Sequence, residues 1–177
     1  MRAAFERATT MGDVVRYTGD MSARTMIFDV EPLVADWNGG QQALDQGVAR
    51  VLSEISVLPA VQVLCFATNS ARRPSVLPSG AGVRVVYLPS AGKPLRTEPY
   101  RDFPRPGVVI GDQVATDGIL ARRLGYTFVL LDYQLTAVPA GPRMMGAYGR
   151  LVRPFLFTRA DPFDDHVANR PEQINDP

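Results

Sequence analysis

Short, continuous apolar runs of β-prone residues recur along the chain, and two of them stop on acidic residues. The run 26–31 ends on Asp29 and Glu31, while the run 108–112 ends on Asp112. Apolar strands without polar alternation are typical of parallel sheets that are covered on both faces. A buried strand that ends in a carboxylate places it at the sheet edge where parallel α/β proteins do chemistry. Two such strands therefore predict a shared acidic site.

Helical segments separate the apolar runs. Extended segments are predicted at residues 25–28, 61–67, 83–88, 107–110 and 126–131. Apolar residues at helical spacing predict a helix at 41–55, with Asn38 as its N-cap. A second helix is predicted at 115–124, where Gly125 takes the position that ends helices in the left-handed conformation. This alternation predicts an α/β fold, a three-layer sandwich with a parallel, Rossmann-like sheet of about five strands.

The chain of 177 residues fits a single domain with terminal extensions. Residues 1–23 have mixed polarity without a clean period and are interpreted as an N-terminal extension, with or without one short helix. Residues 24–159 form the predicted α/β domain. Residues 160–177 are rich in Asp, Pro and Asn, which predicts a flexible tail. The connections after Asp29 and Val76 are short, so no large cap domain is expected.

Composition excludes several function classes. The net charge of +1 gives no reason to expect nucleic acid as a partner, and no apolar run reaches transmembrane length. Cys65 is the lone cysteine, is interpreted as a core residue and favours a reducing, cytoplasmic location. His166 is the single histidine and lies in a polar stretch, which argues against a histidine-rich zinc site or a Ser-His-Asp triad. The apolar segment 153–157 leaves a peripheral membrane or partner contact open, and the oligomeric state cannot be read.

Polar residues follow several of the predicted strands. If the strands are parallel, Asp29, Thr68 and Asp112 share one rim, and Asp117 begins the helix that follows Asp112. Carboxylates from separate strands can hold Mg²⁺, which prefers oxygen ligands and often binds together with phosphate oxygens. Lys93 is the only lysine and is the candidate to offset the charge of a phosphate beside these carboxylates. The pattern favours phosphoryl transfer.

Four segments in order resemble the haloacid dehalogenase (HAD) superfamily of aspartate-nucleophile phosphatases. They are residues 28–31, 66–69, 92–94 and 111–117. The last segment, continued to Gly125, resembles most closely the small subclass III branch that includes the YqeG-like and phosphatidylglycerophosphate phosphatases. This resemblance spans residues 25–132 and implies a HAD-like fold and a Mg²⁺-dependent phosphomonoester hydrolase acting through an aspartyl-phosphate. It also implies a phosphorylated small molecule or a phospholipid headgroup as substrate.

The resemblance assigns a role to each matching residue. Asp29 is the implied nucleophile, Glu31 the general acid/base, and Lys93 the residue that stabilises nucleophile and phosphate. The implied phosphate-binding residues are Thr68, Asn69 and Lys93. The implied metal ligands are Asp29, Glu31 through its backbone carbonyl, Asp112 and Asp117, the last of which would ligate the ion or orient its waters.

Two residues depart from the family pattern, which usually reads Asp-x-Asp, then Gly or Asn, then Thr. Glu31 keeps the carboxylic acid but adds a methylene, which moves the acid group by about 1.5 Å. Leu33 replaces the threonine and removes a hydroxyl. These changes motivate an alternative function, a catalytically weak or inactive HAD-like module with a binding or regulatory role.

Structural roles remain open for the same residues. Asp112 and Asp117 also suit a helix cap, and Thr68, interpreted as the head of a helix, also suits an N-cap without a ligand. Lys93 also suits a solvated loop. The arginine pairs 72–73 and 122–123 are interpreted as solvated helix-surface residues rather than substrate contacts.

Overall fold

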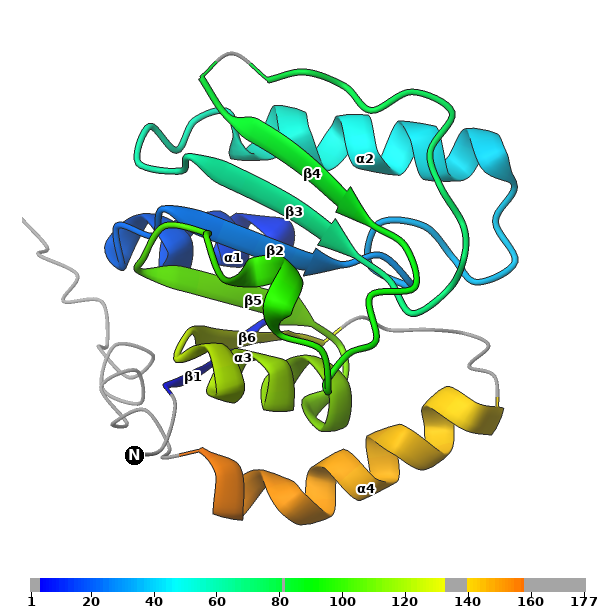
Figure 1. The fold of residues 1–177 in the computed structure, drawn as a ribbon. Helices are drawn as coiled ribbons and strands as arrows, with labels where there is room; N and C mark the ends of the chain where they lie inside the picture. Colours follow the sequence, from blue (N-terminus) through cyan, green and yellow to red (C-terminus); the bar gives the residue numbers. More distant parts are fainter. Residues whose placement is uncertain (1–3, 81, 133–139, 158–177) are drawn as a thin grey trace, which may run out of the picture.

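A single parallel sheet forms the centre of the molecule in the computed structural model, which describes residues 4–80, 82–132 and 140–157. The sheet order is β1-β6-β5-β2-β3-β4, and every neighbouring pair is parallel (Figure 1). The strands are β1 (Phe5–Ala8), β2 (Thr25–Asp29), β3 (Val63–Ala67), β4 (Arg84–Leu88), β5 (Gly107–Gly111) and β6 (Thr127–Leu131). The predicted fold class is confirmed. The sheet has one strand more than the five predicted. The additional strand is β1, which lies within the predicted N-terminal extension.

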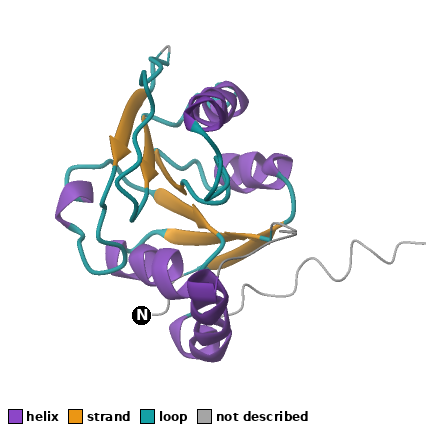
Figure 2. Cartoon of the chain, turned by 90° about the vertical axis from the view of Figure 1, so that its right-hand side faces the viewer, coloured by secondary structure: helices purple, strands orange, loops and turns teal. Residues whose placement is uncertain are grey.

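Helices cover both faces of the sheet, as the view turned by 90° shows (Figure 2). They are α1 (Met11–Asp20), α2 (Gln41–Ile55), α3 (Ile119–Leu124) and α4 (Ala140–Leu156), with a 3₁₀ turn η1 (Glu98–Tyr100) and a π-helical turn η2 (Val114–Gly118). The predicted helix at 115–124 is therefore a π-helical turn that continues into α3. No helix in the described part of the chain is long and apolar enough to cross a bilayer.

Alternating residues of the strands supply two hydrophobic cores, because successive side chains point to opposite faces. Met26 and Phe28 of β2 pack in the core beneath α1 and α2. Ile27 and Cys65 pack in the other core, together with α3 and residues that follow η1. All these side chains are buried, which confirms Cys65 as a core residue and explains why the strands appear as continuous apolar runs.

The helix boundaries have local causes. Thr10 caps α1 in a capping box, in which its hydroxyl accepts from the Asp13 amide while the Asp13 carboxylate accepts from the Thr10 amide. The prediction of Asn38 as N-cap of α2 is wrong, because α2 follows Gly40 and has no side-chain cap. Gly125 ends α3 with φ of 68°, as predicted.

Residues 30–40 connect β2 to α2 without a helix or strand of their own, so no insertion at this connection covers the carboxyl edge of β2. Segment 153–157, for which a membrane or partner contact was left open, ends α4. Its Phe157 is buried against Phe5 and Phe128, while Phe155 is exposed. The predicted tail at 160–177 lies outside the described residues.

Candidate active site

The strand order creates a natural site between β2 and β5. From β2 the chain continues to β3 and β4 on one side, then crosses to β5 and β6 on the other. Connections leave the sheet in opposite directions at this point, which opens a crevice at the carboxyl ends of the two strands. Phe28 pairs with Ile110, so Asp29 and Asp112 follow paired positions at the carboxyl edge. The sheet therefore brings together the two acidic strand ends that the sequence singled out.

Three carboxylates meet in this crevice. Asp29, Asp112 and Asp117 each contribute an oxygen, and these oxygens lie within 4.8 Å of one another. Asp117 is fully buried and comes from the π-helical turn η2. A Cβ atom on Gly111 would lie 2.3 Å from Asp117 Cγ, so only glycine leaves room for this carboxylate. The packing of Asp117 therefore requires glycine at position 111, the last residue of β5.

Lys93 joins two of the carboxylates. Its ammonium nitrogen lies 2.8 Å from Asp29 Oδ1 and 2.7 Å from Asp117 Oδ1, and its side chain is only 2% exposed. The Asn69 side-chain amide fixes the Lys93 backbone, accepting from its N–H at 2.8 Å and donating to its carbonyl at 2.9 Å. The Ala91 amide donates to the Thr68 carbonyl at 2.8 Å. The loop carrying Lys93 is therefore anchored to the end of β3.

Charge and burial act together on these groups. Burial raises the pKa of Asp29 well above its ordinary value, Asp117 raises it further, and Lys93 opposes the shift. Burial alone would lower the pKa of Lys93, but Asp117 and Asp29 raise it above its ordinary value, so the ammonium stays charged. Burial and the Asp117 charge raise the pKa of Asp112 to about 7. The cluster thus holds more carboxyl groups than its one ammonium can neutralise, which favours protonation of Asp29 and Asp112 when no cation is bound.

The donor set fits a hard divalent cation. Asp112 Oδ1 is buried and has no hydrogen-bond partner among the described residues, although buried carboxylate oxygens are normally paired. Asp29, Asp112 and Asp117 offer oxygen ligands only, which is the chemistry that Mg²⁺ prefers. Glu31, another predicted ligand, has both side-chain oxygens engaged by protein donors. The ligation that the resemblance implies uses the Glu31 backbone carbonyl, which these side-chain contacts do not involve.

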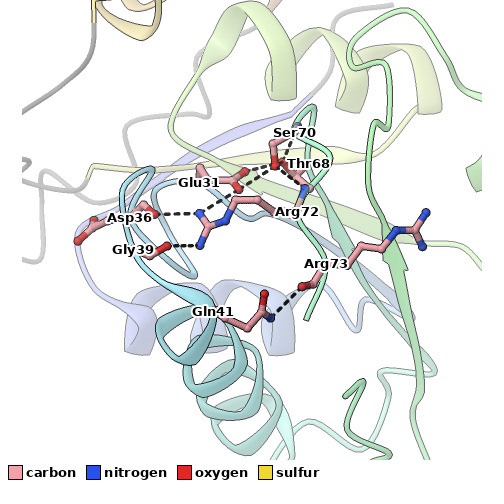
Figure 3. Close-up of polar contacts among 8 residues, drawn as sticks. All are labelled: Glu31, Asp36, Gly39, Gln41, Thr68, Ser70, Arg72 and Arg73. Carbon is pink, nitrogen blue, oxygen red and sulfur yellow. Dashed lines mark hydrogen bonds and ion pairs between the residues drawn. The ribbon is translucent and has the colours of Figure 1, made fainter. Parts of the chain in front are cut away.

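Glu31 lies beside the cluster in a separate polar network, drawn in Figure 3. Its carboxylate accepts from the Thr68 hydroxyl at 2.5 Å, from the Ser70 hydroxyl at 3.1 Å and from Arg72 at 3.4 Å. Leu33, which takes the place of a threonine in the family pattern, is buried in the core beneath α1 and α2. The acid group of Glu31 is thus fixed by three donors that follow β3.

A pocket of about 240 Å³ opens above these groups. Its lining residues are Asp29, Glu31, Trp37, Thr68, Asn69, Ser70, Arg72, Lys93, Gln113 and Thr116. The predicted catalytic and phosphate-binding residues therefore share one pocket, and the remaining predicted metal ligands, Asp112 and Asp117, cluster with Asp29. The roles of these residues stay predictions.

Several details differ from the sequence-based expectations. Thr68 begins a loop rather than a helix, and its amide donates to the Leu88 carbonyl and is not free for a phosphate. Arg72 belongs to that loop and reaches Glu31, so its interpretation as a solvated helix-surface residue is wrong. Ser70 also contacts Glu31 and is absent from the predicted site residues. No motif signals either residue, because both depend on the path of the loop.

Comparison with family models, with curated proteins and with solved structures finds no match to this chain.

Proposed function

We propose that this chain is a Mg²⁺-dependent phosphomonoester hydrolase of the HAD type, acting through an aspartyl-phosphate on Asp29. One observation carries the proposal. A buried lysine joins Asp29 to Asp117 at the carboxyl edge of the sheet, and Asp112 adds a carboxylate with an unpartnered buried oxygen. Such a concentration of buried acids costs folding stability. Its presence therefore favours a functional role over a purely structural one.

The first chemical step forms a phosphoenzyme. A carboxylate oxygen of Asp29 bonds to phosphorus while the bond from phosphorus to the leaving oxygen breaks. Glu31 gives its proton to that leaving oxygen, and the alcohol departs. Lys93 holds the attacking carboxylate in place, and its charge stabilises the negative charge that builds up on the phosphoryl group.

The second step restores the enzyme. A water oxygen bonds to phosphorus as Glu31 takes a proton from that water, and the bond between phosphorus and Asp29 breaks. Phosphate leaves, and Glu31 has regained the proton it gave in the first step. Asp29, Asp112 and Asp117 would hold Mg²⁺, which would supply positive charge that stabilises the negative phosphoryl group.

Hydrolysis of p-nitrophenyl phosphate with Mg²⁺ and with chelator tests the proposal. We expect Asp29→Asn to abolish turnover, because an amide cannot form the phosphoenzyme. The matched control is Asp102→Asn, which alters an exposed aspartate in the turn after η1. If wild-type turnover is no faster than that of Asp29→Asn, the proposed enzymatic function is rejected. A parallel screen of nucleotide, sugar and lipid phosphates assigns the substrate class.

A second candidate function rests on the environment of Glu31. Thr68, Ser70 and Arg72 hold its carboxylate at the end of a side chain one methylene longer than aspartate, and in this second function that position is wrong for proton transfer. The chain would then be a module that binds Mg²⁺ and phosphate with little turnover. Glu31→Asp separates the two functions: a faster rate identifies a slow enzyme. Absence of turnover in both forms, with phosphate binding in Mg²⁺, identifies a binding module.

A further inference from the structure

Arg72 connects its own loop, which follows β3, to the loop that follows β2, as Figure 3 shows. Both loops line the pocket. One guanidinium nitrogen lies 3.4 Å from Glu31 Oε1 and 3.0 Å from the Asp36 carbonyl oxygen. The other terminal nitrogen lies 2.7 Å from the Gly39 carbonyl oxygen. Arg72 thus contacts Glu31 and the segment that follows it at the same time, although it lies in a different loop.

The loop after β2 has a fixed half and an outer half. Residues 30–35 are buried, whereas residues 36–40 are exposed or half-buried. The outer half carries Trp37, the sole tryptophan of the chain, which lines the pocket. We define residues 36–39 as the pocket wall. Among the described residues, the side chain of Arg72 donates hydrogen bonds to two backbone carbonyls of this wall, those of Asp36 and Gly39.

The start of α2 is attached to the other loop independently of the Arg72 side chain. The Gln41 side chain donates to the Arg73 carbonyl at 2.9 Å, and the Ser75 amide donates to Asp45 at 2.8 Å. Loss of the Arg72 guanidinium therefore removes its two hydrogen bonds to the pocket wall and one hydrogen-bond donor to Glu31. The contacts of α2 with the other loop remain.

We propose that Arg72 is a positioning residue that fixes the Glu31 carboxylate and the pocket wall in one catalytic arrangement. Glutamate has one more rotatable bond than aspartate, so its acid group needs more contacts to stay in place. A guanidinium presents a rigid, planar fork of donors that serves three acceptors together, which a lysine cannot reproduce. The catalytic part of this inference rests on the proposed function, and the part that concerns the wall does not.

Leaving-group dependence tests the action of Arg72 through Glu31. An alkyl phosphate such as glycerol 2-phosphate needs proton donation to its leaving oxygen more than p-nitrophenyl phosphate does. We expect Arg72→Ala to lose about tenfold more kcat on the alkyl ester than on the aryl ester. Arg72→Lys should recover only part of this loss. On a Glu31→Gln background, Arg72→Ala should cause no further selective loss.

The matched control is Arg73→Ala. Arg73 is the adjacent arginine, and its exposed side chain points away from Glu31 in Figure 3. Equal losses on both esters, or the same selective loss with and without Glu31, would overturn the positioning role.

Acrylamide quenching of Trp37 fluorescence tests the wall without any reaction. We expect Arg72→Ala to make Trp37 more accessible, and Arg73→Ala to leave it unchanged. Equal quenching in the two variants overturns the wall assignment. If the wild type hydrolyses neither ester, the proposed function fails and the catalytic part of the inference falls with it. The quenching result then decides the wall part alone, so the two failures can be told apart.

Discussion

Replacement of Lys93 by methionine is the sharpest test of how the acidic cluster is held together. Methionine keeps a similar length and apolar stem but removes the ammonium group. In the native protein that ammonium lies within 2.8 Å of both Asp29 and Asp117, and all three side chains are almost fully buried. The variant therefore leaves two buried carboxylates without their shared partner.

The expected cost follows from this geometry. Removal of one partner from a buried ion pair typically costs about 3–5 kcal/mol, because the remaining charge stays buried without compensation. The cost should depend on pH. The pKa of Asp29 is already raised by burial and by Asp117, and loss of Lys93 raises it further. A raised carboxyl pKa gives stability at low pH that is lost as pH rises, so the deficit should grow from pH 5.5 to pH 7.5.

Urea unfolding with chelator at the two pH values measures the deficit. We expect Lys93→Met to lose about 3–5 kcal/mol at pH 7.5 and clearly less at pH 5.5. Addition of Asp117→Asn should restore part of the loss, because one buried charge is removed. Addition of Mg²⁺ to saturation should also stabilise the variant by mass action.

Two results would refute the reasoning about Lys93. Equal stability of variant and wild type at pH 7.5 would mean that the ammonium does not neutralise the buried acids. A deficit that is the same at both pH values would mean that lost packing, rather than lost charge, destabilises the variant. Arg122→Met, which alters an exposed cation, is the control for loss of a positive charge.

Further predictions concern the third carboxylate and the helix beside the site. The folded-state pKa of Asp112 is about 7 against an ordinary value of 3.8, so metal-free protein should lose about 2–4 kcal/mol as pH rises from 4 to 7.5. Asp112→Asn should flatten that pH profile in urea unfolding and weaken Mg²⁺ binding in calorimetry; an unchanged profile contradicts the assignment. Gly47→Ala should destabilise by about 2 kcal/mol or more, since its Cβ would lie 2.0 Å from the Val34 carbonyl oxygen. Gly40→Ala, where an added Cβ meets nothing within 4 Å, should leave the thermal midpoint nearly unchanged, and equal effects of the two substitutions would contradict this packing.

The buried strands were predictable because both of their faces are covered. Every residue of β2, β3 and β5 is buried, which leaves a continuous apolar run in the sequence. β1 leaves no such signal. It is a four-residue edge strand in which only Ala8 is buried, and its mixed polarity resembles an irregular extension. Its place in the sheet depends on pairing with β6, which local sequence does not encode.

The acidic cluster was predictable for a related reason, since strand ends of a parallel sheet converge on one edge. The loop after Thr68 was not. The helix predicted to begin at Thr68 does not form, because Pro74 and Pro78 remove backbone donors and obstruct helical packing, so the segment remains a loop. That loop directs Ser70 and Arg72 onto Glu31, and an arginine pair in sequence gives no sign of such a path.

The pairing of β1 with β6 has a consequence for the way the chain is made. Synthesis delivers β1 before the other strands of the sheet, and its partner β6 after them. The residues of β1 must therefore remain unpaired while the other strands are made, and closure of the long loop between β1 and β6 delays their pairing. Until they return, the outer edge of β6 presents unpaired amides and carbonyls to any other strand nearby. Pairing of β1 therefore covers the outer edge of β6, and the outer edges of β1 and β4 become the edges of the finished sheet.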